Sequence, residues 1–415
     1  MSHVADVHDE RFGHDAAGGA RRFSRVAAGP KPARGARVPP LLTNFRAVRP
    51  RHEVSHEQSL SWLAKAHVAA ATALGGSSGV VDQTIAARFE RQIRRCACGP
   101  DRIRTRASVL ADVESTDWAH HAVYDLSSHP HGQATAARAR RFADEVGAYF
   151  EHAYPEGTAA PDDLIHVTCT GYIAPSGAQQ LVAQRGWGHI TRVTHAYHMG
   201  CYAALPTIRI ASGYLATAKP GHRVEVAHTE LCSLHLDPTD HSAEQLVVQT
   251  LFADGLISYS VVSDGRRGGL QLLGQTEHIL PGSSHMMGWS VGDFGMAMTL
   301  HRDVPNQVAR AIRGFVQALF EAAGLSLGRL RDCVLAVHPG GPKIIDRVRD
   351  VLELCDDQVA ASNAVLRDHG NMSSATLPHI WMRIIDDPMV RAGTPVVSLA
   401  FGPGLTVSGA VLEKR

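Results

Sequence analysis

Short apolar runs alternate with segments of helical spacing along most of this 415-residue chain. An apolar run of about four to eight residues beside turn residues is typical of a strand, whereas apolar residues three and four positions apart indicate one face of a helix. The expected strands are 41–45, 164–168, 224–229, 257–262, 334–337, 396–401 and 405–412, and the expected helices are 57–74, 81–95, 203–216, 307–323 and 345–354. Strands that alternate with helices favour an α/β fold with covered sheets. Gly402-Pro403-Gly404 predicts a turn between the last two strands.

The composition is that of an ordinary globular protein and gives no sign of a nucleic-acid partner. Hydrophobic residues make up 44% of the chain and charged residues 20%, so a chain of this length can bury a large core. The 41 Lys and Arg residues balance 40 Asp and Glu residues, which argues against nucleic-acid binding through bulk positive charge. No apolar run approaches the ~20 residues of a membrane-spanning helix, so we expect no membrane partner.

The cysteines and the N-terminus indicate a cytoplasmic protein. Seven scattered cysteines do not resemble a secreted disulfide framework, and the first residues lack the apolar segment of a secretory signal. Residues 1–40 are rich in Gly, Ala, Arg and Pro, and we expect a disordered leader because they contain too little apolar material to bury. An organelle-targeting peptide is the alternative, but such peptides are poor in the acidic residues found here at Asp6, Asp9 and Glu10.

Three residues in distinctive short segments form the candidate catalytic set: Cys201, His338 and Asn371. A thiol attacks as its thiolate, so it needs a nearby base or imidazolium and an electropositive setting that lowers its pKa. The oxyanion formed by that attack needs neutral hydrogen-bond donors, which His and Asn side chains can provide. Taken singly, each residue has an ordinary interpretation, as a buried core cysteine, a histidine beside a turn and a turn or cap asparagine.

The flanking segments resemble the type III polyketide synthases, the chalcone synthase family. Residues 338–344 read His-Pro-Gly-Gly-Pro-Lys-Ile, and residues 370–375 read Gly-Asn-Met-Ser-Ser-Ala. Leu-Phe-Ala-Asp-Gly at 251–255 and Phe-Gly-Pro-Gly-Leu at 401–405 resemble two further segments of that family. Ala400 departs from the pattern, because the family's loop usually has a Gly there. The first two runs together are specific, whereas a lone Cys would be weak.

The resemblance, which extends from about Arg88 to the C-terminus, implies a thiolase-like α/β fold of two similar halves with layered sheets and buried helices. The halves would be 41–267, carrying the nucleophilic Cys, and 268–415, carrying the His and Asn. Members of the family are usually homodimers, so a homodimer is expected. No internal repeat in the sequence supports the duplication independently.

The resemblance also implies a role for each catalytic residue. Cys201 would accept an acyl group from a thioester, and His338 would pair with its thiolate. His338 and Asn371 would bind the thioester carbonyl of the malonyl extender, where negative charge builds as carbon dioxide leaves. No metal and no redox cofactor is implied. The substrates would be thioesters of coenzyme A or of the phosphopantetheine arm of an acyl carrier protein.

Local alignment with the family predicts a substrate cavity. The candidate lining residues are Phe252, Trp289, Met298, Phe401, Gly402, Gly404, Glu230, Cys232 and His235. Phe252 falls at a gatekeeper position, Met298 occupies the second gatekeeper position, and Trp289 stands where many plant members have Gly. Cys232 and His235 replace smaller hydroxyl residues, as in microbial members that make pyrones or resorcinols. A core Trp that packs against the sheet is an equally good interpretation of Trp289.

Arg88, Arg91 and Arg95 share one face of the helix expected at 81–95. A cationic face suits the phosphates of coenzyme A or of a phosphopantetheine arm, and the positions align with the family's basic residues. An ordinary solvated helix face is the alternative. Further arginines in the same region would suit an acidic carrier protein: Arg94, Arg102, Arg104 and Arg106.

The leading hypothesis is therefore a type III polyketide synthase-like acyltransferase that forms carbon–carbon bonds by Claisen condensation and cyclises its product. The second hypothesis keeps the same residues but joins two carrier-bound β-ketoacyl chains, as in ketosynthases that form the α-pyrone of myxobacterial antibiotics. A third, of another class, is an inactive thiolase-fold binding protein, which the retention of all three catalytic residue types disfavours.

Overall fold

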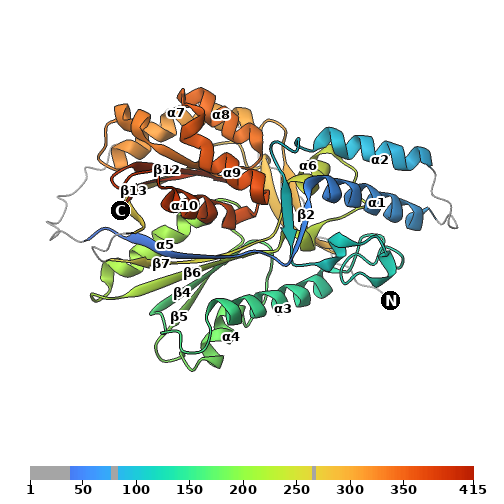
Figure 1. Ribbon diagram of the computed structural model, residues 1–415, viewed down its shortest axis with the longest axis horizontal. Coiled ribbons are helices and arrows are strands. Elements are labelled where there is room, and N and C mark those ends of the chain that lie inside the picture. The colour runs from blue at the N-terminus through green and yellow to red at the C-terminus, as the bar shows by residue number, and fades with distance from the viewer. Residues whose placement is uncertain (1–37, 76–82, 264–267) are drawn as a thin grey trace, which may run out of the picture. The chain divides into compact units, whose positions relative to one another are not determined.

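A nine-stranded mixed sheet runs through the computed structural model, which describes residues 38–75, 83–263 and 268–415 (Figure 1). In spatial order its strands are β11 (Val334–Val337), β12 (Pro395–Gly402), β13 (Thr406–Lys414), β8 (Leu270–Ile279), β1 (Leu41–Val48), β7 (Gly255–Val262), β6 (Arg223–Glu230), β4 (Asp163–Thr168) and β5 (Arg192–Tyr197). Every strand expected from the sequence is present, and the turn at 402–404 joins β12 to β13 as an antiparallel pair.

All five helices expected from the sequence are present among the described residues, and five further helices were not predicted. Together they are α1 (His56–Leu74), α2 (Gln83–Cys96), α3 (Thr135–Ala153), α4 (Gly177–Gln184), α5 (Ala204–Thr217), α6 (Ala243–Leu251), α7 (Val304–Ala322), α8 (Pro342–Leu352), α9 (Ala360–His369) and α10 (Thr376–Asp386). The helix expected from residue 81 is described only from Gln83. None of these helices could serve as a membrane span.

Successive side chains along a strand point alternately toward a middle layer of helices and toward an outer layer of helices. In β12, Val396 and Ala400 pack with α5 and α10, whereas Val397 and Leu399 pack with α7 and α8 on the opposite face. This alternation follows from the two-residue period of a strand. The strands of the first part behave in the same way, with α3 and α4 covering their outer face. Helices α5 and α10 are therefore sandwiched between strands from both parts of the chain.

The proposed halves meet in the middle of the sheet, where β1 pairs with β8 through Leu41↔Gln271 and Leu42↔Leu270. Residues 38–415 form one compact unit. The boundary near Gly268 stays a prediction. The leader expected at 1–40 falls almost entirely on residues outside the described ranges.

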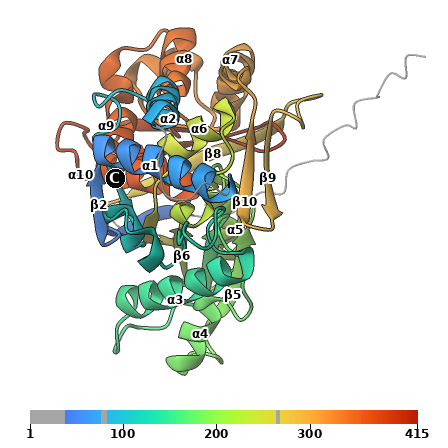
Figure 2. The same ribbon diagram turned by 90° about the vertical axis from the view of Figure 1, so that its right-hand side faces the viewer.

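A separate hairpin stands beside α6 (Figure 2) and is formed by β9 (Met287–Gly292) and β10 (Gly295–Leu300). The amide of Gln245 in α6 donates to the carbonyl of Met298 at 2.6 Å. A short two-stranded sheet of β2 (His52–Ser55) and β3 (Thr105–Ser108) lies at the start of α1. The hairpin matters most for function, because it supplies one wall of the cavity described next.

Candidate active site

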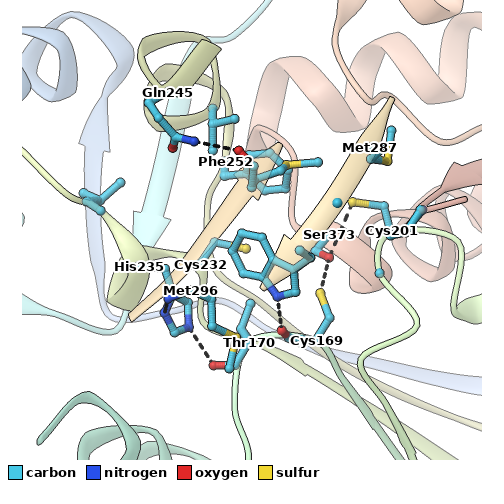
Figure 3. A pocket seen from close by; sticks show the side chains of 17 residues that line it. Cys169, Thr170, Cys201, Cys232, His235, Gln245, Phe252, Met287, Met296 and Ser373 are labelled. Atoms are coloured by element: carbon cyan, nitrogen blue, oxygen red, sulfur yellow. Dashed lines mark hydrogen bonds between the residues drawn. The ribbon is translucent and has the colours of Figure 1, made fainter. Parts of the chain in front are cut away.

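Cys201 opens onto a buried cavity of about 40 Å³ (Figure 3). The cavity is lined by Cys169, Thr170, Gly200, Cys201, Cys232, His235, Leu236, Gln245, Val248, Phe252, Met287, Gly288, Trp289, Met296, Met298, Ser373 and Pro403. The wall is therefore mostly apolar, with three thiols and a few hydroxyl and amide groups. An apolar cavity with few polar groups is the usual form of a small-molecule site.

Cys201 lies in the turn between β5 and α5, just before the helix begins at Ala204. Its Sγ atom is 3.6 Å from the hydroxyl of Ser373, and the side chain is buried. Burial raises the pKa of this thiol to about 12, the Ser373 hydrogen bond lowers it, and the charge of Glu230 raises it further. Burial of Cys201 therefore acts against the lowered pKa that a reactive thiol needs, because desolvation disfavours the charged thiolate.

His338 follows β11, where its backbone amide donates to the carbonyl of Leu399 at 2.8 Å. The side chain is 1% exposed, and burial lowers its pKa to about 3. Among the described residues neither ring nitrogen has a hydrogen-bond partner. The structure therefore does not join His338 to Cys201 by a hydrogen bond. An unpartnered buried polar group costs about 1–3 kcal/mol, so such a group calls for an explanation.

Asn371 is fixed by a short backbone ladder to the end of α6. Its amide donates to the carbonyl of Leu251 at 3.0 Å, and its carbonyl accepts from the amide of Ala253 at 2.8 Å. The side-chain oxygen accepts from the amide of Ser373 at 2.9 Å, which leaves the Nδ2 donor without a partner in the described part of the chain. Asn371 and Cys201 thus approach the same residue, Ser373, from two sides.

Five of the predicted cavity residues line the same cavity as Cys201: Phe252, Trp289, Met298, Cys232 and His235. The indole nitrogen of Trp289 donates to the carbonyl of Cys169 at 2.5 Å, so this side chain holds the hairpin across the cavity. His235 ties the hairpin from the other side, because Nδ1 accepts from the amide of Met296 and Nε2 donates to the carbonyl of Thr170. Burial lowers the pKa of His235 to about 4, which suits this neutral bridging form.

The other predicted lining residues lie behind the wall. Glu230 is fully buried at the end of β6 and is separated from the cavity by Cys169 and Thr170, which donate to its carboxylate. Phe401, Gly402 and Gly404 flank Pro403, the member of that loop that reaches the cavity. These residues can shape the wall without forming its surface.

Gly402 is needed because the ring of Tyr202 lies against it. A Cβ atom added at this position would lie 2.1 Å from Cδ1 of Tyr202, which no relaxed structure tolerates. We expect Gly402→Ala to lower the free energy of unfolding by about 1–3 kcal/mol, as overpacking in a core does. Denaturant unfolding measures this loss. Gly314→Ala in α7 is the matched control, because nothing lies within 4 Å of its Cβ, and a stability change there as large as that of Gly402→Ala would contradict the steric explanation.

Several lining residues were not predicted from the sequence, and two of them, Ser373 and Cys169, contact each other beside Cys201. Ser373 lies inside the motif at 370–375, but only the fold places its hydroxyl against both Cys201 and Cys169. Cys169 directly follows β4, and residues after the ends of parallel strands commonly gather at one edge of a sheet. That cue was available, although nothing in the flanking residues distinguished Cys169 from the other scattered cysteines.

The three predicted phosphate-binding arginines are exposed on α2, and no ion pair joins Arg88, Arg91 or Arg95 to an acidic side chain among the described residues. The neighbouring arginines differ in this respect. Arg94 pairs with Glu57 and Glu90, Arg102 pairs with Asp346, Arg104 pairs with Asp368, and Arg106 is buried against the carbonyls of Gln249 and Phe252. In the described part of the chain, the arginines of α2 that form no ion pair are therefore the three that helical spacing predicted to bind phosphate.

Sequence comparison identifies two matching domains. Residues 147–265 match the N-terminal domain of the chalcone and stilbene synthases, and residues 271–414 match their C-terminal domain. The chain is 29% identical over 258 residues to type III polyketide synthase C of Arabidopsis thaliana, a match that covers 60% of this chain and 66% of that protein. It is 30% identical to probable polyketide synthase 1 of Dictyostelium discoideum over the same share of this chain, but over 8% of that protein.

Solved structures of type III polyketide synthases share the fold. PKS-I of the brown alga Ectocarpus siliculosus superposes with a TM-score of 0.77 at 22% identity, over 92% of this chain and 100% of that one. The 1,3,6,8-tetrahydroxynaphthalene synthase of Streptomyces coelicolor gives 0.72 at 24% identity, over 90% and 99%. The expected thiolase-like α/β fold is confirmed by these likenesses. The chain belongs to the chalcone and stilbene synthase family of type III polyketide synthases.

Proposed function

We propose that this protein is a ketosynthase that loads an acyl group on Cys201, decarboxylates a malonyl thioester and joins the two by Claisen condensation. The observation that carries the proposal is a set of buried donors in the two specific motifs: among the described residues, the ring nitrogens of His338 and the Nδ2 of Asn371 have no hydrogen-bond partner. Such donors suit an oxyanion, because they can stabilise charge that develops only during the reaction. The chemistry needs no metal or redox cofactor, since the carboxylate that is lost supplies the carbanion.

Neutral His338 fits this role better than a charged one. Burial holds the pKa of His338 at about 3, so at neutral pH the imidazole carries one proton and can donate one hydrogen bond. The Nδ2 group of Asn371 supplies a second donor. In the proposed reaction both donate to the thioester oxygen, on which negative charge collects as carbon dioxide leaves.

The product proposal rests on the cavity wall. Trp289 and Met298 leave little room, so a long acyl chain requires the β9–β10 hairpin or its side chains to move. The apolar wall suits an aliphatic chain, and the thiol and imidazole groups of Cys232 and His235 leave few hydroxyl donors to direct cyclisation. We therefore keep a pyrone or a resorcinol as the proposed product class.

The test of the proposed function is incubation of the protein with an acyl-coenzyme A and carboxyl-labelled malonyl-coenzyme A. Release of labelled carbon dioxide together with a condensed product, identified by mass spectrometry, is the expected result. If neither is produced with any acyl chain length, the proposed condensation of coenzyme A thioesters is wrong. Products formed only from carrier-bound β-ketoacyl chains would favour the second hypothesis of the sequence analysis, the α-pyrone-forming ketosynthase.

The basic face of α2 gives a prediction that separates these two kinds of donor. Replacing Arg88, Arg91 or Arg95 with Ala is expected to raise KM for coenzyme A thioesters more than it lowers kcat, because binding far from the reacting carbon is removed. Each lost phosphate contact should raise KM roughly 10- to 100-fold, at the ~1.5–3 kcal/mol typical of charged hydrogen bonds. Thioesters of free pantetheine lack the distal phosphates, so their kinetics should hardly change.

Arg94→Ala is the matched control, since this side chain is already engaged by Glu57 and Glu90. If carrier proteins are the true donors, the Arg94 and Arg102 variants should also weaken binding, and added salt should have the same effect because it screens exposed charges. Identical kinetics for all variants with every donor would show that α2 presents an ordinary solvated face. The pairing of Arg94 and Arg102 with acidic side chains favours coenzyme A as the donor.

A homodimer is proposed from the family and from the edge of the sheet. Strand β5 is the last strand of the sheet, and its outer edge pairs with no other strand among the described residues. Two exposed large side chains precede β5 in the sequence: Ile190, two residues before it, and Tyr172, farther upstream. An open edge beside apolar side chains is a surface that proteins commonly cover. Sedimentation equilibrium would measure the mass in solution.

A further inference from the structure

Arg106 in β3 is a buried cation, and among the described residues it forms no ion pair with an acidic side chain. Its guanidinium is engaged by neutral acceptors instead. Nη1 donates to the carbonyls of Gln249 at 2.7 Å and Phe252 at 2.8 Å, and Nη2 donates to the hydroxyl of Ser59. Burial lowers the pKa of Arg106 to about 10, so the group is still charged at neutral pH. Burying a cation without a carboxylate is costly, so its place in the fold calls for an explanation.

The two carbonyls that Arg106 contacts belong to the end of α6. The last carbonyls of a helix have no partner within the helix, and this end carries partial negative charge. Gln249 lies in the last turn of α6, and Phe252 directly follows the helix. The guanidinium therefore caps α6 and fixes the backbone of Phe252, whose side chain lines the cavity (Figure 3).

Asn371 is the reason that the carbonyl of Gln249 needs an outside donor. In a continued helix the amide of Ala253 would donate to Gln249, four residues earlier. Here that amide donates to the carbonyl of Asn371 at 2.8 Å, and the amide of Asn371 donates to the carbonyl of Leu251 at 3.0 Å. The end of α6 thus gives up one helical hydrogen bond in order to hold Asn371, and Arg106 supplies the donor that replaces it.

The aliphatic part of Arg106 also lies against the residue that precedes Asn371. A Cβ atom added at Gly370 would lie 3.3 Å from Cγ of Arg106 and 3.1 Å from the carbonyl oxygen of Leu251. Gly370 has a φ of +75°, a conformation that favours glycine. One side chain therefore supports both segments of the short backbone ladder, the end of α6 and the chain that leads into Asn371.

We propose that Arg106 is a positioning residue for decarboxylation, which holds the end of α6 so that Asn371 presents its Nδ2 donor to the thioester oxygen. The inference rests on the proposed role of Asn371. It assigns Arg106 a place inside the site, in contrast to the carrier-protein contact that the sequence suggested. Arg106 does not touch the substrate in this assignment and acts only through the backbone of residues 249–253 and 370–371.

The geometry explains why this position requires arginine. The guanidinium reaches acceptors in three separate segments: Ser59 in α1, Gln249 in α6 and Phe252 after it. A planar fork with several fixed donors can hold such a set at once, whereas the ammonium group of lysine is a single point. Arg106→Lys should therefore restore part of the function that Arg106→Gln loses.

The first measurement compares decarboxylation with loading in Arg106→Gln. Release of labelled carbon dioxide from malonyl-coenzyme A should fall roughly 10- to 100-fold, because misplacing a catalytic group by about 1 Å can cost ~10²-fold. Single-turnover loading of Cys201 by an acyl-coenzyme A should change by less than about threefold, since the interaction removed belongs to the other step. Arg106→Lys should lie between the wild type and Arg106→Gln. Unchanged carbon dioxide release in Arg106→Gln would overturn the proposal.

A double-mutant cycle shows whether Arg106 acts through Asn371. In the Asn371→Ala background the donor is already gone, so adding Arg106→Gln should lower carbon dioxide release by less than about twofold more. If Arg106→Gln costs as much in that background as in the wild type, the two residues act independently and the proposal is wrong.

Arg185→Gln is the matched control for the loss of a structural arginine. Arg185 also donates to a backbone carbonyl, that of Tyr154, with Nε at 3.2 Å and Nη2 at 3.0 Å, but it lies at the end of α4. This variant should retain the wild-type decarboxylation rate per Cys201 that can be loaded. An equal loss in Arg185→Gln and Arg106→Gln would reduce the effect to general destabilisation and overturn the positioning role.

Hydrogen exchange tests the clamp without any thioester. In Arg106→Gln the peptides that contain Ala253 and Asn371 should exchange at least about 10-fold faster than in the wild type, because a weakened ladder opens locally. Arg185→Gln should leave both peptides unchanged. If Arg106→Gln does not fold, Arg106→Lys and Ser59→Ala provide the same comparison with smaller expected effects. Exchange that stays at the wild-type rate in every folded variant would overturn the clamp.

The two readouts separate this inference from the proposed function. A wild-type protein that never decarboxylates malonyl-coenzyme A, with faster exchange in Arg106→Gln, would keep the clamp on Asn371 and lose the ketosynthase proposal. A wild-type protein that decarboxylates, with neither step nor exchange altered in Arg106→Gln, would lose the positioning role of Arg106 alone.

Discussion

Replacing Cys201 with Ala is expected to reduce condensation of acyl and malonyl thioesters to the background rate. The thiol is the only group of that side chain that can form the acyl-enzyme. Covalent catalysis by an activated thiol splits a difficult step into two easier ones, so its removal leaves only binding and oxyanion stabilisation. Triad-type residues lost in this way typically cost ~10⁴–10⁶ in kcat. Product formation from labelled malonyl-coenzyme A measures the loss.

Two other thiols, Cys169 and Cys232, line the same cavity and are the alternative acyl acceptors that could contradict this prediction. Burial raises the pKa of both well above the ordinary thiol value, and each lies near the charge of Glu230. Cys201 has the less strongly raised pKa and contacts Ser373. If Cys201→Ala retains a tenth or more of the wild-type rate, another thiol carries the acyl group. Cys355→Ser serves as the control for loss of a cysteine outside the cavity.

The second large effect is expected at Asn371. Asn371→Ala removes a buried donor whose Nδ2 has no other partner among the described residues, so decarboxylation of malonyl-coenzyme A should fall by ~10²–10³. Loading of Cys201 by an acyl-coenzyme A should persist, because the nucleophilic thiol remains. Labelled carbon dioxide release and single-turnover acylation measure the two steps separately.

A matched surface variant keeps the Asn371 result interpretable. Asn306→Ala in α7 removes an exposed amide that donates to Asp303 and should change neither step. Equal loss of loading and decarboxylation in Asn371→Ala would indicate that the loop around Ser373 has moved, since Oδ1 of Asn371 also accepts from the Ser373 amide. Unchanged carbon dioxide release would show that Asn371 does not bind the thioester oxygen.

The spacing of apolar residues predicted an element correctly where it followed one period along the whole element. The β12–β13 hairpin and helix α7 are examples, because their apolar spacing and their turn residues agree. Strand β5 was not predicted, since its sequence Arg-Val-Thr-His-Ala-Tyr is largely polar and half exposed at the sheet edge. The β9–β10 hairpin was also missed as an element, because its Met and Trp residues face a cavity rather than a continuous core.

The sequence predicted some of the residues that line the cavity but not the electrostatics of the site. The motifs named Cys201, His338 and Asn371, yet the sign of the Cys201 pKa shift depends on burial by segments far apart in the chain. The sequence likewise could not predict which arginines of α2 form ion pairs, because only the fold places Glu57 beside Arg94. The contacts of Cys169 with Ser373 and Glu230 join residues 204 and 61 positions apart, which no local pattern predicts.

The measurement that tests the central proposal most directly is peptide mapping after incubation with an acyl-coenzyme A alone. Intact mass should increase by one acyl group, and the modified peptide should contain Cys201. The adduct should be absent from Cys201→Ala and present in Cys355→Ser. An acyl group found on Cys169 or Cys232 in the wild-type protein, or no adduct with donors of any chain length, would contradict the assignment of Cys201 as the nucleophile.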